Sequence, residues 1–286
     1  SSVSWGTNFS SIGLSLSATA NLNQNMSDSS IALTLPDLNI SLSRFYPFKR
    51  RHAAGAERWY EKISVSYTGQ ISNSINTKED RLLRSNLIKD WHNGMQHRIP
   101  VSGNFTLFNY INVSPSFNFT DRMYTNKVTK SWNTATQKEV VADTTYGFHN
   151  IYNWDLSLSA STKLYGMFIP NRKIFGDKIQ AIRHVITPSV SFSYAPDFGS
   201  SRYGYYSTYQ RTNADGSVEL VDYSPYSNGL YSVPGRGKTG NVSFSFDNNI
   251  EMKIKSDKDS TGIRKISIID NLGFRMSYNM AAKEKP

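Results

Sequence analysis

Few side chains in this 286-residue chain could take part in covalent or metal chemistry. The chain has no cysteine, which excludes thiolate metal sites, cysteine nucleophiles and disulfides within these residues. It has five histidines, and their spacing is not the i, i+4 spacing of a helical zinc site: His52, His92, His97, His149 and His184. No serine is marked by its spacing as the partner of a histidine, which nucleophilic catalysis would require. The residues therefore indicate neither an enzyme nor a bound cofactor.

One basic cluster could bind a ligand. Lys49, Arg50 and Arg51 directly follow the aromatic stretch at 45–48. Lysine and arginine both bind phosphate, and arginine does so through two parallel hydrogen bonds. Two interpretations stay open: an anchor that meets anionic lipid headgroups, which we favour, and a contact to a phosphorylated substrate. The net charge of +10 comes from residues that are scattered or lie in turns, so it does not indicate a nucleic-acid partner.

Alternation of apolar and polar side chains with a period of two dominates the sequence, for example over 12–22. Because successive side chains of a strand point to opposite faces, this pattern predicts half-buried strands, and its recurrence predicts about eleven of them. A phase slip at Pro36-Asp37 would turn the apolar set over, so we expect a β-bulge there. The polar run Asp247-Asn248-Asn249 predicts a tight turn.

The strands predicted by this pattern are suited to a membrane. They run about 9 to 14 residues, whereas globular strands average about 5 to 6 and a tilted membrane strand needs roughly 9 to 11. Their second side carries Ser, Thr, Asn and Gln with few charges, and aromatic residues gather near strand ends. We therefore predict an all-β, antiparallel transmembrane β-barrel; a large soluble sandwich or a secreted β-rich adhesin is the alternative.

The polar side of these strands would line the lumen of such a barrel. Hydroxyl and amide groups there can exchange hydrogen bonds with passing sugars without holding any one of them tightly. The candidate lumen-lining residues are Ser15, Ser17, Thr19, Asn21, Ser64, Ser66, Thr68, Ser157, Ser159, Ser191 and Ser193.

The lengths of the connections indicate which end of the barrel is which. Outer-membrane barrels alternate short periplasmic turns with longer outer loops. Tight turns are predicted at Ser10-Ser11 and Phe108-Asn109, and the long segments 76–95, 125–145 and 196–239 fall at the other end. The alternation assigns the end with short turns, together with the basic cluster, to the periplasm.

Several stretches resemble a known family when taken in their order. They are LPDLNISLSR at 35–44 with YPF at 46–48, TKLYG at 162–166 leading to IRHVITPSVSFSYAPD at 182–197, and TGNVSFSFDNN at 239–249. They resemble the barrel domain of the LptD/OstA family, the lipopolysaccharide-assembly proteins of Gram-negative outer membranes. The closest resemblance is to a divergent branch with loops rich in Tyr and Asn.

The resemblance implies a translocon that inserts lipopolysaccharide into the outer leaflet of the cell outer membrane. The family barrel has about 26 strands, so residues 1–286 would be a single segment of it, without the periplasmic jelly-roll domain. The implied partners are lipopolysaccharide, a plug lipoprotein of the LptE type, the periplasmic bridge proteins of the transport system and the lipid bilayer. A general porin or a nutrient-receptor barrel is the alternative; it predicts a narrowing loop folded inward and conductance to small solutes.

Overall fold

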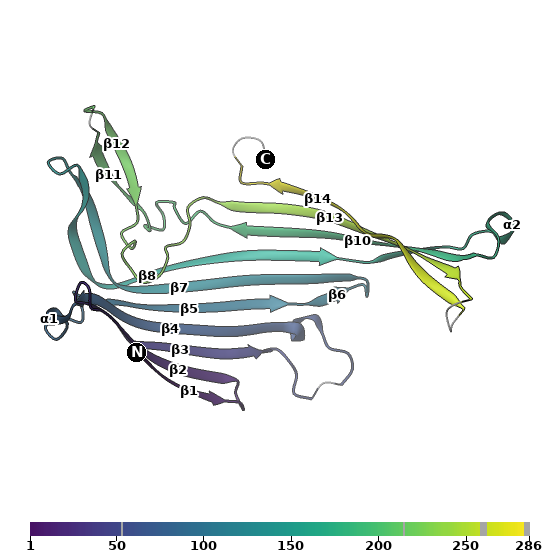
Figure 1. Cartoon of the computed structure of the whole chain (residues 1–286), viewed down its shortest axis with the longest axis horizontal. Coiled ribbons are helices and arrows are strands. Elements are labelled where there is room, and N and C mark those ends of the chain that lie inside the picture. Colours follow the sequence, from purple (N-terminus) through teal and green to yellow (C-terminus); the bar gives the residue numbers. More distant parts are fainter. Residues whose placement is uncertain (53, 214, 258–261, 283–286) are drawn as a thin grey trace.

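The computed structural model describes residues 1–52, 54–213, 215–257 and 262–282, most of which form one antiparallel sheet (Figure 1). Ten strands follow one another across this sheet: β1 (Ser2–Phe9), β2 (Leu14–Asn25), β3 (Ser30–Phe45), β4 (Ile63–Lys78), β5 (His92–Gly103), β7 (Ile111–Asn133), β8 (Lys138–Ser161), β10 (Ile179–Ala195), β13 (Thr239–Lys255) and β14 (Ile263–Asn279). The all-β antiparallel prediction is confirmed. The sheet is open in the described residues, with β1 and β14 at its two edges.

The remaining elements are short. β6 (Phe105–Leu107) pairs with β7, β9 (Leu164–Phe168) pairs with β10, and β11 (Ser207–Thr212) and β12 (Val218–Tyr223) form a separate hairpin. The helical turns are η1 (Trp59–Lys62), α1 (Glu79–Leu82) and α2 (Arg172–Phe175). No helix within the described ranges is both long enough and apolar enough to cross a membrane.

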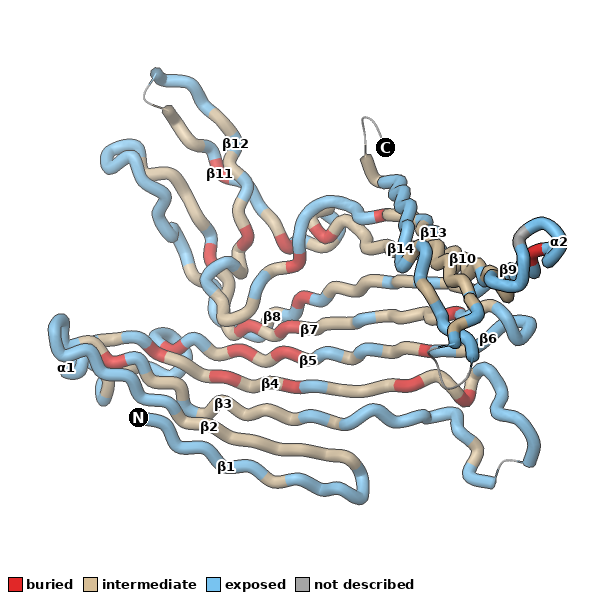
Figure 2. The backbone as a smooth tube through the Cα atoms, turned by 45° about the vertical axis from the view of Figure 1, so that its right-hand side comes forward, coloured by how far each residue is buried: buried red, intermediate tan, exposed pale blue. Residues whose placement is uncertain are grey.

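The large sheet is a single curved layer (Figure 2), and the register of its strands gives it two chemically different faces. Leu16 of β2 lies opposite Ile40 of β3, and the next residue, Ser17, lies opposite Asn39. Apolar side chains remain open to the surroundings; for example, Leu158 is 43% exposed. No second layer covers this apolar face in the part of the chain that the structure describes. The sandwich alternative required two apolar faces to meet, and the described residues do not form that arrangement.

The bulge expected at Pro36-Asp37 is present. Thr19 of β2 pairs with Asp37, whereas Asn21, two residues later, pairs with Thr34, so β3 carries one extra residue at Leu35-Pro36. The extra residue keeps the hydroxyl and amide side chains on one face of β3 on both sides of the interruption.

The turn predicted at Asp247-Asn248-Asn249 is wrong, because these residues lie inside β13. Asn248 Nδ2 donates to the Leu272 carbonyl at 3.0 Å, and Asn249 Nδ2 donates to the Asp270 carbonyl at 2.9 Å. The β13–β14 register shifts at this point. Side-chain amides thus bind the neighbouring backbone across an irregular stretch of the ladder, and a single strand of 17 residues replaces the two that were expected.

The long segment expected at 125–145 is mostly strand. β7 has 23 residues and β8 has 24, and the two continue as a hairpin beyond the neighbouring strands (Figure 1). Residues of the connection between β10 and β13 return over that end of the sheet, where Phe198 and Tyr205 pack against Tyr124 and Ile151.

Candidate functional site

All of the candidate lumen residues lie on one face of the sheet, called the polar face below. Cross-strand pairs connect this face from β2 to β8 in one row: Ser15, Ser41, Thr68, Arg98, Thr120 and Asn153. On the next strand, Ser193 and Ser191 of β10 lie opposite Ser157 and Ser159 of β8. The structure therefore brings the predicted residues together as one continuous surface.

Hydroxyl groups on the polar face also bind one another between strands. Ser157 Oγ lies 2.6 Å from Ser116 Oγ, and Ser64 Oγ lies 3.1 Å from Ser102 Oγ. A hydroxyl group has one donor and two acceptor positions, so a pair of hydroxyls retains capacity for water or a sugar. Neutral hydrogen-bonding groups are therefore abundant on the polar face between β2 and β8.

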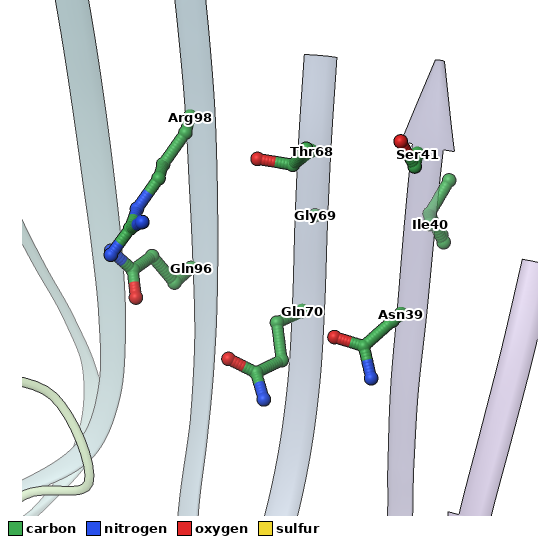
Figure 3. A pocket seen from close by; sticks show the side chains of 8 residues that line it. All are labelled: Asn39, Ile40, Ser41, Thr68, Gly69, Gln70, Gln96 and Arg98. Atoms are coloured by element: carbon green, nitrogen blue, oxygen red, sulfur yellow. The ribbon is translucent and has the colours of Figure 1, made fainter. Parts of the chain in front are cut away.

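A hollow of about 300 Å³ lies on the polar face where β3, β4 and β5 run side by side (Figure 3). It is lined by Asn39, Ile40, Ser41, Thr68, Gly69, Gln70, Gln96 and Arg98. The polar side chains of Asn39, Gln70, Gln96 and Arg98 project from the same side of the three strands. Thr68 is the lining residue that the sequence predicted. Gln70 lies in phase with Thr68, and Arg98 lies in phase with Gln96, so the alternation itself could have found them.

The tyrosine-rich segment 196–238 contacts the polar face at the end opposite the short turns through residues 198–206 and 226–233, whereas the β11–β12 hairpin projects away from the sheet (Figure 1). The Tyr124 hydroxyl donates to the Tyr231 carbonyl at 3.0 Å, and Tyr124 belongs to a buried cluster with Ile151, Phe198 and Tyr205. This contact joins residues more than 100 positions apart, so no local pattern signals it. The segment is folded inward onto the polar face, which is the arrangement that the porin alternative predicts.

A side chain of the same segment binds the backbone of β8 beyond the point where β8 and β10 stop pairing. The β8–β10 pairing ends at Leu156 and Tyr194. Beyond that point the Tyr205 hydroxyl accepts a hydrogen bond from the Tyr152 amide and donates to the Tyr152 carbonyl, each at 2.9 Å. A tyrosine side chain thereby satisfies backbone groups that the next strand would otherwise pair.

The basic cluster lies between β3 and η1, and Arg50 is held there by Glu61. Arg50 Nε lies 2.7 Å from Glu61 Oε1, and Arg50 Nη2 lies 2.9 Å from Glu61 Oε2. The Arg58 amide also donates to Glu61, whose side chain is almost fully buried. The hydrogen bonds from Arg50, followed by the one from the Arg58 amide, lower the pKa of Glu61 to about 2. The Glu61 carboxylate therefore already accepts the two hydrogen bonds that Arg50 could otherwise donate to a phosphate.

The two neighbours of Arg50 have weaker or no internal partners. Lys49 Nζ lies 3.1 Å from Glu57 Oε1 in an exposed ion pair, which raises the pKa of Lys49. Arg51 is exposed and has no carboxylate within ion-pair distance among the residues that the structure describes. Of the three cations, Arg51 is the most available to an external anion.

The histidines are not brought together. His97 Nδ1 lies 2.6 Å from the Tyr67 hydroxyl, and His184 Nε2 lies 3.2 Å from Asn248 Oδ1, on different parts of the sheet. In the described ranges no group of three or more His, Cys, Asp or Glu side chains could hold a metal ion.

An antiparallel sheet in a single layer, with one exposed apolar face and one hydroxyl-rich face, is consistent with the class of outer-membrane β-barrel proteins. The family model described as LptD protein matches residues 1–285, and the chain belongs to the LptD family. This is an outer-membrane family with a general role in lipopolysaccharide transport and assembly. The resemblance seen in the sequence is thus confirmed. No curated protein and no solved structure matches the chain.

Proposed function

We propose that this chain is part of an outer-membrane translocon that inserts lipopolysaccharide into the outer leaflet. The observation that carries the proposal is the separation of two faces on one sheet, in a chain of the LptD family. In this proposal residues 1–286 form a segment of a larger closed barrel of about 26 strands. Its partners are a plug lipoprotein of the LptE type and the periplasmic bridge proteins.

The two faces give each part of the substrate a suitable surface. The apolar face meets the acyl chains of the bilayer, where an unpaired polar group would be costly. The polar face offers neutral donors and acceptors, such as the hydroxyls of Ser157 and Ser191, that a passing glycan can exchange one for another. Export by this surface forms and breaks no covalent bond, so the free energy for transport has to be delivered by other components.

The basic cluster is proposed to contact lipid phosphate at the periplasmic end. Arg50 is bound to Glu61, so its role in this proposal is to order the connection between β3 and β4. Lys49 and Arg51 make the contact with the lipid phosphate. Lys49→Gln with Arg51→Gln should then reduce site-specific photocrosslinking between this connection and lipopolysaccharide. Equal crosslinking would leave these residues as an anchor to membrane headgroups.

Depletion of the full-length protein in a Gram-negative host tests the function. The proposal expects lipopolysaccharide to accumulate in the periplasmic or inner-membrane fractions, and surface display to return when the wild-type gene is restored. Unchanged surface display during depletion would contradict it.

A porin or nutrient-receptor barrel is the second candidate, and the inward position of segment 196–238 favours it. Such a barrel would give steady conductance to small solutes in planar bilayers, and its depletion would leave lipopolysaccharide display intact. The two functions therefore differ in two independent measurements.

A further inference from the structure

Two arginines are diagonal neighbours on the polar face. Gln96 of β5 lies opposite Arg122 of β7, and Arg98, two residues along β5, lies opposite Thr120. Diagonal positions in an antiparallel pair are within reach of long side chains. Two positive charges placed so close repel each other, and the cost grows where water is partly excluded.

Neither Arg98 nor Arg122 has an ion-pair partner in the part of the chain that the structure describes. The neighbouring acids have other partners: Asp37 accepts a hydrogen bond from Gln70 at 3.0 Å, and Asp155 accepts one from Asn118 at 2.8 Å. Asp121, next to Arg122, likewise accepts a hydrogen bond from the Asn150 amide at 2.7 Å, so none of these acids forms an ion pair with either arginine in the described residues.

Elsewhere on the same face an arginine is paired with an acid. Arg183 of β10 lies directly opposite Glu251 of β13, and Arg183 Nη2 is 2.6 Å from Glu251 Oε2. The fold therefore compensates a basic residue at one end of the polar face, whereas it leaves Arg98 and Arg122 uncompensated.

Arg122 is buried, with 8% of its surface exposed. One guanidinium nitrogen, Nη1, donates to Asn153 Oδ1, but Nε has no hydrogen-bond partner among the residues that the structure describes. A buried donor without an acceptor costs free energy unless a ligand or water supplies one. An anion at this point would supply an acceptor and also remove the repulsion from Arg98.

Arg98 borders the hollow on the polar face, and neutral groups line the rest of it (Figure 3). When the Gln96 amide is oriented with its oxygen toward Arg98, this oxygen accepts from Arg98 Nε at 2.9 Å and from Nη2 at 3.1 Å, which holds the guanidinium at the rim. Gln70, Asn39 and Thr68 offer amide and hydroxyl groups that suit the hydroxyls of a sugar ring. A guanidinium binds a planar or tetrahedral anion through two hydrogen bonds.

We propose that Arg98 and Arg122 form a subsite for the anionic group of a sugar, a phosphate or a carboxylate, with the ring seated in the neighbouring hollow. That the sugar belongs to a transported glycan rests on the proposed function; the recognition of the anion does not. The subsite gives the polar face a point of attraction for the anionic groups of charged sugars.

Binding of simple sugars to the purified full-length protein in detergent tests the subsite. The probes are glucose 1-phosphate, glucuronate and uncharged glucose, followed by ligand-observed NMR. We expect at least one anionic probe to bind about tenfold more tightly than glucose, the ratio that about 1.4 kcal/mol provides. Tighter binding of glucose 1-phosphate alone identifies phosphate as the ligand, and tighter binding of glucuronate alone identifies carboxylate.

Arg98→Gln and Arg122→Gln should each reduce that preference toward the value for glucose, and the Arg→Lys variants should keep part of it. Arg183→Gln is the matched control, because Arg183 lies on the polar face of β10 and is paired with Glu251. Heat-modifiable migration on gels shows which variants are folded. Equal binding of charged and uncharged sugars by the wild type, or an equal loss in Arg183→Gln, would overturn the proposal. If depletion left lipopolysaccharide display intact while anion binding persisted, the translocon function would fail and the subsite would stand.

Discussion

Ser157 Oγ lies 2.6 Å from Ser116 Oγ across β8 and β7, and the adjacent residues Leu156 and Phe117 face each other on the opposite side of the same two strands. One register therefore builds both faces at once. Because the side-chain period of a strand is two, a slip by one residue would exchange the hydroxyl face with the apolar face.

Leu158→Lys and Ser159→Lys place the same charge on the two faces of β8 at neighbouring positions. On the lipid face a lysine costs up to about 2–4 kcal/mol at the bilayer midplane and less toward the interfaces. We expect Leu158→Lys to lower the free energy of unfolding in liposomes, measured by urea titration, by a cost in this range. Ser159→Lys should change it much less, since its charge meets water. Equal losses in the two variants would show that the faces do not differ in their surroundings.

Gly229→Ala should loosen the tyrosine-rich segment. An added Cβ would collide with the ring of Tyr124, so the contact that fixes the segment to the polar face has to shift. We expect faster cleavage within 196–238 by protease added to intact outer-membrane vesicles. Gly235→Ala lies in the same segment with open space around its added carbon and should behave as the wild type. Identical cleavage of both variants would show that the Tyr124 contact does not secure the segment.

Conductance measurements on wild type and Gly229→Ala distinguish the translocon function from the porin function. If segment 196–238 closes the lumen of a translocon, the wild type should conduct poorly in planar bilayers and Gly229→Ala should conduct more. A porin would already conduct steadily in the wild-type form. High wild-type conductance would therefore favour the second candidate function.

The Arg50–Glu61 pair should make the connection at 46–62 sensitive to acid. Because the folded-state pKa of Glu61 is lowered to about 2, the ordering it provides is complete above its usual value of 4.5 and is lost as the pH falls through about 2. A dye on Ala56→Cys should show constant anisotropy from neutral pH to about 5 and a decrease between about 4.5 and 2.

Two variants check the origin of this acid response. Glu61→Gln should give low anisotropy over the whole range, because Arg50 loses its carboxylate partner. Glu57→Gln removes only the exposed pair with Lys49 and should keep the wild-type response. A pH response that persists in Glu61→Gln would assign it to another group.

The period of two was sufficient to predict most of the sheet. The alternation around Ser157 and Ser191 placed both on one face, and the phase slip at Pro36-Asp37 located the bulge, because each follows from strand geometry alone. The turn expected at Asp247 to Asn249 failed because polar residues signal a turn only when their side chains do not bind a neighbouring strand.

The features of the site that the sequence did not predict depend on contacts between residues far apart in the chain. The basic cluster carries no local sign that Glu61, 11 residues away, takes Arg50 as its partner. The inward fold of the tyrosine-rich segment depends on Tyr124, Ile151 and Gly94, which belong to other strands. Arg98 and Arg122 become neighbours only through the β5–β7 register.

Residue-by-residue accessibility along 156–160 of β8 in the membrane tests the two-face architecture most directly. Single cysteines would be introduced at these positions. One set of samples would be treated with a membrane-impermeant thiol reagent. A second set would be labelled with a fluorophore and then exposed to brominated lipids, which quench it. The architecture predicts that positions 157 and 159 react from water and that positions 156, 158 and 160 are quenched by lipid. Uniform quenching, uniform reaction or the reverse alternation would contradict it.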